Sequence, residues 1–418
     1  MSFQALAEEI AVRARAAANR VAELPSDVRG GALQRAADCL ESSCEAILES
    51  NAKDLEAAHE SGLAAPLRDR LTLDLAQVQA MARSLRDIAS LPDPVGEITG
   101  MWTRPNGLRV GRMRIPLGVI FVIYESRPNV TTDVAGLCLK SGNATLLRGG
   151  SEAFHTNSFL AELFRGALRE SGIPEDVIQL VPHRERELVD LLLEREDEID
   201  LVIPRGGEGL IRHVAERSRI PVIKHYKGVC HVYLDRHAEP KMARDITINS
   251  KCQRVSVCNS AETLLVHKAL ADTLLPQLLG ELRALGVEIR GCAQTLQRCQ
   301  DAIAATEDDW REEYLDKILA VRVVDSMDQA IDHIRRYGSN HTEAIVTDDL
   351  RSAREFVRRV NSSSVFVNAS TRFADGFQLG LGAEVGISTT KIHWYGPMGI
   401  EGLTTQKFIA FGDGTLIE

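Results

Sequence analysis

The sequence predicts an α/β protein with two doubly wound domains, and three observations lead to this fold class. Apolar strands alternate with amphipathic helices over residues 116–224. The alternation resumes more loosely after residue 228. The chain has 418 residues, of which 44% are hydrophobic and 26% charged, which is ordinary for a globular chain of two or three domains. Strands that alternate with helices predict parallel sheets covered on both faces.

Residues before the first buried strand predict a layer of helices. We expect helices over residues 2–23, 26–59 and 72–89. Pro25 ends the first helix, Gly62 and Pro66 break the second, and Pro92 and Pro94 stop the third.

Residues 96–114 predict a β-hairpin, because Pro105-Asn106-Gly107 lies between two short strand-like runs. We assign this ribbon, with about residues 396–418, to a small β element that joins copies of the chain in a homo-oligomer. The alternative is a local hairpin that folds onto its own domain.

The alternating pattern defines two α/β domains. The first combines residues 1–95 with 115–227, with strands at 117–124, 144–147, 177–181, 199–203 and 221–224 and helices at 129–140, 152–170, 183–193 and 208–217. The second covers residues 228–395, with helices at 239–251, 269–285, 326–337 and 350–360 and strands at 262–266, 318–324, 343–346 and 364–367. A Gly-rich segment from residue 380 then leads to a strand-like run at 407–410.

Charge and cysteine usage argue against several classes of protein. The formal net charge is −10 and no long basic run occurs, so nucleic acid and anionic membranes are not expected partners. The first residues do not resemble a signal peptide, and no run of about 18 apolar residues occurs, so we expect a cytoplasmic protein. The eight cysteines are irregularly spaced, without paired CxxC or HExxH motifs, so we expect neither a disulfide framework nor a metal site.

Cys258 lies on a polar turn between the helix predicted at 239–251 and the strand predicted at 262–266. Ser256, Asn259 and Ser260 surround it and offer donors that can stabilise a thiolate, which is the nucleophilic form of cysteine. The alternative is that Cys258 is a small buried core residue.

Two strand-to-helix turns are rich in glycine, and they are Arg148-Gly149-Gly150-Ser151 and Arg205-Gly206-Gly207-Glu208-Gly209. Glycines there let the backbone approach a phosphate, and a helix N-terminus favours the anion. Neither turn is a full GxGxxG, so a tight turn without a ligand is the alternative. Strands that bind NAD often end in an acid, whereas this strand ends in Arg148, a cation that suits the 2′-phosphate of NADP(H).

Longer motifs occur along almost the whole chain. They are Pro116-Leu-Gly-Val-Ile120, Tyr124-Glu-Ser-Arg-Pro-Asn129, Leu139-Lys-Ser-Gly-Asn143, Leu147-Arg-Gly-Gly-Ser-Glu152, Ile203-Pro-Arg-Gly206, Val257-Cys-Asn259, Glu262-Thr-Leu-Leu-Val-His267, His341-Thr342, Asn368-Ala-Ser-Thr-Arg-Phe-Ala-Asp-Gly376 and Gly396-Pro-Met-Gly399. These motifs resemble the gamma-glutamyl phosphate reductase family of the aldehyde dehydrogenase superfamily. The sequence departs from that family at Phe121 and Ser256, where glycine is usual, and at Trp394 and Tyr395.

The resemblance implies an aldehyde dehydrogenase-like fold and a specific reaction. It implies reduction of L-glutamate 5-phosphate by NADPH to L-glutamate 5-semialdehyde and phosphate, through a cysteine thioester, as the second step of proline biosynthesis. It also makes the upstream glutamate 5-kinase a candidate partner.

Mapped onto this sequence, the resemblance makes Cys258 the nucleophile and Asn129 a side-chain amide of the oxyanion hole. Arg148 falls where the superfamily has a basic residue at the adenosine ribose, and Glu313 where it has the glutamate that holds the nicotinamide ribose. His225 falls approximately where hydrolytic members have the glutamate that activates water, which fits an enzyme that must not hydrolyse its thioester.

Two arginines in the family-like loops are candidates for binding the charged ends of the substrate. We expect Arg127 near the leaving phosphate, because it lies two residues from Asn129, and Arg372 near the α-carboxylate. The alternative is that either arginine pairs with a local acid such as Glu125 or Asp375.

Two other functions compete with this interpretation. A hydrolytic NAD(P)-dependent aldehyde dehydrogenase would share the fold but form a free acid. A cysteine acyl hydrolase or transferase would use the thiol without a nicotinamide cofactor.

Overall fold

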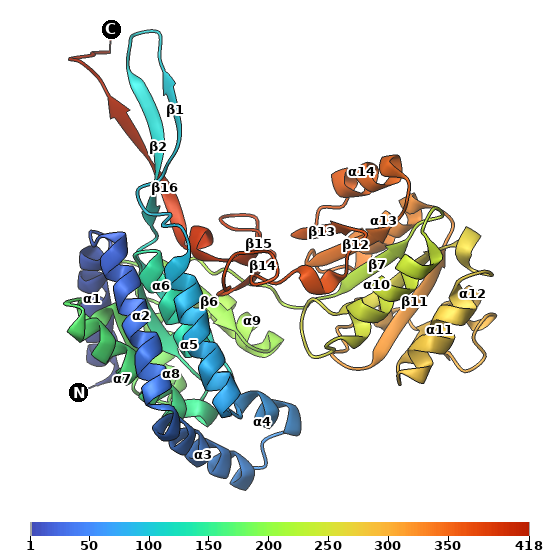
Figure 1. Cartoon of the computed structure of the whole chain (residues 1–418), viewed down its shortest axis with the longest axis horizontal. Helices are drawn as coiled ribbons and strands as arrows, with labels where there is room; N and C mark the ends of the chain where they lie inside the picture. Colours follow the sequence, from blue (N-terminus) through green and yellow to red (C-terminus); the bar gives the residue numbers. More distant parts are fainter. Residues whose placement is uncertain (1, 418) are drawn as a thin grey trace. The chain divides into compact units, whose positions relative to one another are not determined.

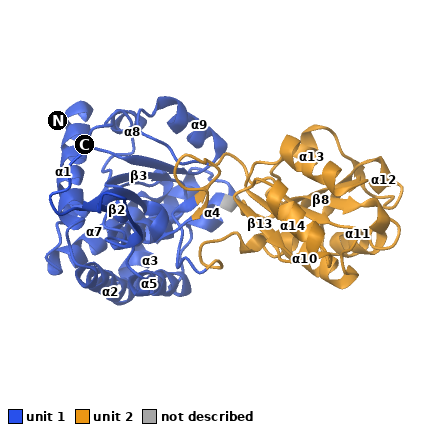
Figure 2. Cartoon of the chain, turned by 90° about the horizontal axis from the view of Figure 1, so that it is seen from above, with its two compact units in different colours: residues 1–224, 380–386, 398–418 blue, residues 225–379, 387–397 orange. Residues whose placement is uncertain are grey.

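The computed structural model describes residues 2–417, except for the side chains of Ala65 and Pro66. The chain forms two compact units, drawn in different colours in Figure 2. Unit 1 is made of residues up to Lys224, Gly380–Gly386 and the residues from Met398 onward, and unit 2 of His225–Leu379 and Ile387–Pro397. The backbone therefore passes from one unit to the other after residues 224, 379, 386 and 397.

Unit 1 begins with a helical layer, as expected. The helices that precede the first strand are α1 (Phe3–Val21), α2 (Ser26–Ser42), α3 (Cys44–Glu60), α4 (Ala65–Leu71) and α5 (Leu75–Ser90) (Figure 1). The later helices of unit 1 are α6 (Pro128–Lys140), α7 (Phe154–Glu170), α8 (Arg186–Leu192) and α9 (Glu208–Arg217). The single helix expected over 26–59 is wrong, because Ser43 leaves the helical conformation (φ −107°, ψ 16°) and separates α2 from α3. The third expected helix starts later than 72, because Asp74 and Gln77 form a capping box at the start of α5.

The sheet of unit 1 is parallel, with the order β5 (Ile178–Leu180), β4 (Ala144–Arg148), β3 (Val119–Tyr124), β6 (Leu201–Arg205). Every residue of the central strand β3 is buried, so helices cover both faces of the sheet. The strand expected at 221–224 is wrong, since Val222 makes only an isolated bridge to Val202.

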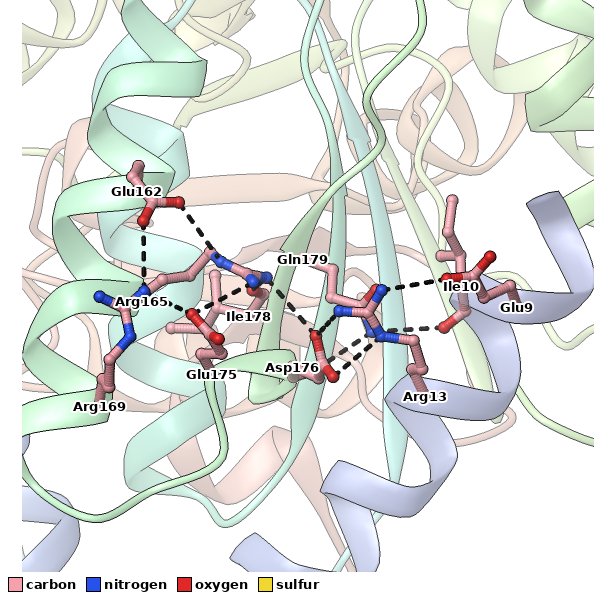
Figure 3. Close-up of polar contacts among 10 residues, drawn as sticks. All are labelled: Glu9, Ile10, Arg13, Glu162, Arg165, Arg169, Glu175, Asp176, Ile178 and Gln179. Carbon is pink, nitrogen blue, oxygen red and sulfur yellow. Dashed lines mark hydrogen bonds and ion pairs between the residues drawn. The ribbon is translucent and has the colours of Figure 1, made fainter. Parts of the chain in front are cut away.

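Helix α1 is fixed to the edge of this sheet by polar contacts as well as by its alanine-rich face (Figure 3). The guanidinium of Arg13 donates to both carboxylate oxygens of Asp176, at 2.6 and 3.0 Å. The Gln179 amide donates to the Ile10 carbonyl at 3.3 Å. Arg165 lies 3.6 Å from the same Asp176 carboxylate. Such solvent-exposed ion pairs contribute about 1 kcal/mol or less each, so burial of its apolar face stabilises α1 more than these contacts do.

A three-stranded antiparallel sheet is also part of unit 1. It consists of β1 (Ile98–Thr103), β2 (Arg109–Pro116) and β16 (Thr404–Phe411), with β2 in the centre. Pro105-Asn106-Gly107 forms the turn, where Gly107 has φ +84° and the Arg104 N–H donates to the Leu108 carbonyl at 2.8 Å. All residues of β1 are exposed, so this ribbon is not folded onto the body of unit 1.

Unit 2 is a second α/β structure. Its strands are β7 (Cys230–Leu234), β8 (Ala261–His267), β9 (Glu288–Gly291), β10 (Ile303–Ala304), β11 (Ile318–Val324), β12 (Thr342–Val346) and β13 (Ser364–Val367), and its helices are α10 (Pro240–Cys252), α11 (Leu275–Ala284), α12 (Ala293–Leu296), α13 (Met327–Tyr337) and α14 (Leu350–Arg359). The strand order is β10-β9-β11-β8-β7-β12-β13, and all neighbouring pairs are parallel.

The sequence analysis missed four of these elements: β7, β9, α12 and β10. The omission of β7 matters most, because β7 is fully buried and lies between β8 and β12. Two further short strands, β14 (Gly386–Ser388) and β15 (Gly396–Met398), pair where the chain passes between the units. No helix among residues 2–417 is long and apolar enough to cross a membrane.

Candidate active site and cofactor-binding turns

Cys258 lies on the turn between α10 and β8, so the predicted helix–turn–strand arrangement is confirmed. The thiol-bearing residue is half-buried. The backbone of Gly228 packs directly against this turn, since a Cβ on Gly228 would lie 1.9 Å from the Cys258 carbonyl oxygen. Any side chain at position 228 would therefore displace the turn.

The residues around Cys258 come from one edge of the parallel sheet of unit 2. Cys258 precedes β8, Gly228 precedes β7 and His341 precedes β12, and these three strands are neighbours. The candidate site thus lies at the amino ends of the strands. Open α/β sheets more often bind ligands at the carboxyl ends, so the usual rule would have pointed to the wrong edge.

Two imidazoles lie beside the thiol. The Cys258 Sγ atom and one ring nitrogen each of His225 and His341 are all within 4.8 Å of one another. The rings of His225 and His341 meet edge to face, with centroids 5.5 Å apart. Sequence reasoning had assigned no role to His341. It directly precedes a buried strand, which is a usable signal, but only the strand order shows that this strand lies near Cys258.

The polar residues next to Cys258 in the sequence have a different role from the one expected. The Asn259 amide donates to the Ala374 carbonyl at 2.9 Å, and the Ser260 hydroxyl donates to the Ser250 carbonyl at 3.4 Å. The Thr371 hydroxyl donates to the Asn259 carbonyl at 2.7 Å. These side chains therefore fix the shape of the turn, and their donors are directed to backbone carbonyls.

A second cysteine, Cys230, lies close to the same turn. It is buried, and its thiol donates to the Cys258 carbonyl at 3.1 Å. Burial and the negative charge of Glu343 raise the pKa of the Cys230 thiol well above its usual range. Cys230 is therefore held as a neutral thiol, which is a poor nucleophile.

Glu313 and Arg372 place one charge of each sign around the turn. Burial raises the pKa of the Glu313 carboxyl, although a hydrogen bond from the Gly228 N–H and the charge of His341 oppose this shift. Burial lowers the pKa of the Arg372 guanidinium, against the effect of Asp375. The Arg372 Nε donates to Gln253 Oε1 at 2.9 Å. Two predicted site residues, Glu313 and Arg372, therefore lie in unit 2 close to the Cys258 turn.

A buried ion pair joins the segments on either side of the Cys258 turn. Lys251, near the end of α10, donates to Glu262, at the start of β8, at 2.6 Å, and both side chains are fully buried. Glu262 also accepts the Leu315 N–H at 3.3 Å. Leu315 has φ +52°, a left-handed conformation that leucine rarely adopts. The pair thus connects the two ends of the Cys258 turn to the segment that carries Glu313.

The glycine-rich turns lie in unit 1, at the carboxyl ends of neighbouring parallel strands. Arg148 is the last residue of β4 and Arg205 the last residue of β6, and β3 lies between these strands. This edge is where parallel α/β sheets usually bind nucleotides. A hollow at the first turn is lined by Gly149, Gly150, Phe154, Asn157, Leu180, Val181, His183 and Arg184.

The first turn has buried donors that the protein itself does not use. Among the described residues, Nε of Arg148 and Nδ2 of Asn157 are buried without a hydrogen-bond partner. Gly149 permits the close approach of Asn157, because a Cβ there would lie 2.0 Å from the Asn157 Nδ2. Another donor of the same guanidinium is already used, because Arg148 Nη2 donates to the Arg184 carbonyl at 2.9 Å. An oxygen-rich ligand would satisfy the remaining donors.

The second turn already binds a negative charge from its own chain. The Gly207 N–H donates to the Glu125 carboxylate at 2.9 Å. A Cβ on Gly206 would lie 2.4 Å from the same carboxylate. A phosphate at this turn would have to displace Glu125, so the geometry favours the Arg148 turn as the anion site.

The loop that carries Arg127 and Asn129 is held in an unusual conformation. Ser126 has φ +42°, and the Glu152 carboxylate accepts both its N–H and its hydroxyl, at 2.7 and 2.6 Å. Backbone strain of this kind often marks functional sites. The Asn129 amide donates to Asp133 at 3.0 Å on the first turn of α6. Asn129 is exposed, so its amide is accessible to a ligand.

The fold and the thiol site together correspond to a known class of enzyme. The model of the aldehyde dehydrogenase family matches residues 2–291. Similarity to individual proteins shows which branch of this family the chain resembles most. The chain is 56% identical to a gamma-glutamyl phosphate reductase of Geotalea daltonii, over 98% of both chains. It is 54% identical to one of Desulfatibacillum aliphaticivorans, over the whole of both chains. A solved structure of gamma-glutamyl phosphate reductase from Thermotoga maritima has a TM-score of 0.96 and 42% identity, and the match covers 99% of this chain and 100% of that one. The chain belongs to the gamma-glutamyl phosphate reductase family.

Proposed function

We propose that this protein reduces L-glutamate 5-phosphate to L-glutamate 5-semialdehyde with NADPH and releases phosphate, the second step of proline biosynthesis. The observation that carries the proposal is the near-full-length similarity to gamma-glutamyl phosphate reductases, at 54–56% identity. The half-buried thiol of Cys258, with two imidazoles beside it, supports a covalent mechanism.

The first chemical step is acyl transfer to Cys258. His225 or His341 takes the thiol proton, and the sulfur attacks the carbonyl carbon of the acyl phosphate. Backbone N–H groups and the Asn129 amide stabilise the oxyanion. Loss of one such donor typically lowers the rate by about 10²–10³. The bond between the carbonyl carbon and the phosphate oxygen then breaks, phosphate leaves, and Cys258 carries a thioester.

NADPH, which the Arg148 turn and Glu313 would hold, would supply the hydride that reduces the thioester. The Cys258 sulfur then leaves, accepts a proton from the nearby imidazole and regenerates the thiol. No step consumes water, so the protein must protect the thioester from hydrolysis. An imidazole at position 225, where hydrolytic relatives are expected to have a carboxylate, is compatible with this requirement.

The test is the reverse reaction. Glutamate semialdehyde should reduce NADP⁺ only when inorganic phosphate is present, and the product should be the acyl phosphate. NADP⁺ reduction without phosphate would favour a hydrolytic aldehyde dehydrogenase. Absence of NADPH binding in a fluorescence titration would favour an acyl hydrolase or transferase.

Aldehyde dehydrogenase family members use nicotinamide cofactors, and the residues of the first turn fit the phosphorylated form. Buried donors on Arg148 and Asn157 are available at the turn 148–151, and Gly149, Gly150 and Ser151 complete it. We assign the adenosine 2′-phosphate to Arg148 and the nicotinamide ribose to Glu313. Gly206, Gly207 and Gly209 at the second turn are secondary candidates, because Glu125 occupies that turn.

Arg148→Ala is expected to weaken NADPH binding more than NADH binding, because only NADPH carries the 2′-phosphate. A charge-assisted hydrogen bond contributes about 1.5–3 kcal/mol, which corresponds to a loss of roughly 10- to 150-fold in affinity. Fluorescence titrations with both cofactors measure the difference. Arg205→Ala, at the matching position of the other turn, is the control and should not change the preference. Equal losses for both cofactors in Arg148→Ala would contradict the assignment.

We further propose that Arg127 binds the leaving phosphate and Arg372 the α-carboxylate. Arg372 donates through Nε to Gln253, and no ion pair with Asp375 is found within 4.0 Å among the described residues, which supports a ligand for its remaining donors. Arg127 follows the strained Ser126, so the backbone at this point is held in one conformation.

The exposed ribbon of β1, β2 and β16 supports assembly into a homo-oligomer. It presents large apolar side chains, including Trp102, Phe408 and Phe411. Phe408 is 67% exposed, although the Arg112 guanidinium lies 5.1 Å from its ring centroid. Apolar patches of this kind typically mark protein interfaces. A complex with glutamate 5-kinase is a separate proposal that a pull-down of the two purified enzymes would test.

Phe408→Asp is expected to shift the protein toward single chains, because a carboxylate would be buried without a partner in an apolar interface. Light scattering after size exclusion measures the mass directly. The control is Val12→Asp, at an exposed apolar position on α1 outside the ribbon, and it should not change the mass. An unchanged mass in Phe408→Asp would place the interface elsewhere.

A further inference from the structure

Three side chains of the kinds that bind zinc lie close together in unit 2, and they are Cys258, His225 and His341. Thiolate sulfur and imidazole nitrogen are the usual zinc donors in proteins. The Cys258 Sγ and one nitrogen each of His225 and His341 lie within 4.8 Å of one another. Ligand atoms around a tetrahedral zinc ion are about 3.3–3.6 Å apart, as its bond lengths require. A side-chain movement of about 1 Å would therefore close the three donors on one ion.

The two imidazoles also have the supporting contacts that metal-binding histidines usually have. His225 Nδ1 lies 2.8 Å from the Ile387 carbonyl oxygen, and His341 Nδ1 lies 2.8 Å from the Thr342 hydroxyl. Contacts of this kind at one ring nitrogen fix the orientation of the imidazole. The thiol turn is rigid as well, because Gly228 packs against its backbone and Thr371 bonds to Asn259.

We propose that Cys258, His225 and His341 form a reversible inhibitory site for Zn²⁺. On binding, the Cys258 thiol releases its proton to solvent, and a sulfur–zinc bond and two nitrogen–zinc bonds form. Five of the six waters of the aqueous ion leave, and one remains as the fourth ligand of the tetrahedral ion. The sulfur lone pair that would attack the substrate is then used to bind the metal.

This inference revises the expectation that the chain has no metal site. That expectation came from the absence of paired ligand motifs, whereas these three ligands come from distant parts of the sequence that the sheet brings together. Zinc binding does not depend on the proposed reaction, and only the inhibition rests on Cys258 being the nucleophile. An acylated Cys258 could not bind the ion, so substrate and zinc exclude each other.

The test uses Co²⁺ as a spectroscopic substitute for Zn²⁺ on the full-length protein, freed of metal by chelator and kept reduced with a phosphine. One Co²⁺ per chain should give the charge-transfer absorption of a cobalt–thiolate bond, and Zn²⁺ should displace it. Cys258→Ser should abolish this absorption. His225→Gln and His341→Asn should each lower Zn²⁺ affinity by at least about tenfold. His237→Ala and Cys252→Ser, elsewhere in unit 2, are controls that should bind the metal like the original protein.

Enzyme activity measured in parallel should fall as Zn²⁺ fills the site. Added substrate should slow the onset of this inhibition. Persistence of the charge-transfer band in Cys258→Ser, or unchanged affinity in the histidine variants, would overturn the proposed site. Full activity with the site saturated would overturn the inhibitory role. His225 is half-buried, so His225→Gln keeps the proposal testable if a variant of the buried His341 fails to fold.

Discussion

Cys258→Ser is expected to lower the rate of NADP⁺ reduction by several orders of magnitude while NADPH binding stays intact. An alcohol at neutral pH is a far poorer nucleophile than a thiol whose proton a neighbouring imidazole accepts. The turn proposed to bind the cofactor, at Arg148, belongs to unit 1 and Cys258 to unit 2, so the substitution is not expected to change that turn. Steady-state kinetics give the first quantity and fluorescence titration the second.

Cys252→Ser is the matched control, because Cys252 is the last residue of α10, shortly before the turn that carries the candidate nucleophile. Burial raises the pKa of the Cys252 thiol, which disfavours its nucleophilic form. This variant should retain activity. A dead Cys252→Ser together with an active Cys258→Ser would overturn the assignment.

Lys251→Met is expected to lower the free energy of unfolding by about 3–5 kcal/mol, because it removes one partner of a fully buried ion pair. The remaining carboxylate of Glu262 would be buried without its counter-charge. Urea unfolding, followed through the buried Trp310 of unit 2, measures this loss. Lys251→Met combined with Glu262→Leu should recover most of the stability, since both charges are then absent.

The exposed pair of Lys241 and Asp245 on the same helix supplies the control. Both side chains are more than half exposed, so Lys241→Met should change stability by less than about 1 kcal/mol. A loss at Lys251 as small as the loss at Lys241 would show that the buried pair does not stabilise unit 2.

The effect of Lys251→Met should also grow with pH. Burial raises the pKa of Glu262 to about 7, even though Lys251 opposes the shift. The stability from this raised pKa is present below the ordinary carboxyl value and is lost as pH rises through about 7. Without Lys251 the folded-state pKa rises further, so the loss continues to higher pH. The difference between the two proteins should therefore be larger at pH 8 than at pH 6.

Local patterns predicted the elements whose signal lies within one segment. The strand expected at 318–324 is β11 with the same bounds, because a run of that length in which every residue but Arg322 is apolar is typical of a buried strand. The strand β7 was missed because its first residues, Cys230 and His231, do not look like core. In the structure, the ring of His231 is buried and bonds to the Glu343 carboxylate at 2.8 Å. A long-range partner makes that burial possible, and no local pattern reveals it.

In the candidate site too, some residues could be predicted from their local sequence, whereas others depend on contacts between distant parts of the chain. Cys258 could be predicted, because the helix, the polar turn and the strand around it are consecutive in the sequence. The neighbour His341 could not, because its proximity depends on β7 lying between β8 and β12. Asn259 and Ser260 were assigned to the wrong partners for a related reason, since the carbonyls they bind belong to residues 374 and 250.

The discontinuity of unit 1 reverses the order in which the two units can be completed during synthesis. Residues of unit 1 up to Lys224 leave the ribosome before any residue of unit 2, but unit 1 also requires the segment from Met398 onward. That segment supplies β16, which pairs with β2 along its whole length, and the Leu403 carbonyl that accepts the buried Asn143 amide at 2.8 Å. Unit 2 needs nothing beyond Pro397. A nascent chain that stalls before residue 398 therefore exposes an unpaired edge of β2, where pairing with another chain is favoured. Damage to the segment from Met398 onward therefore acts on unit 1, and unit 2 can finish folding first.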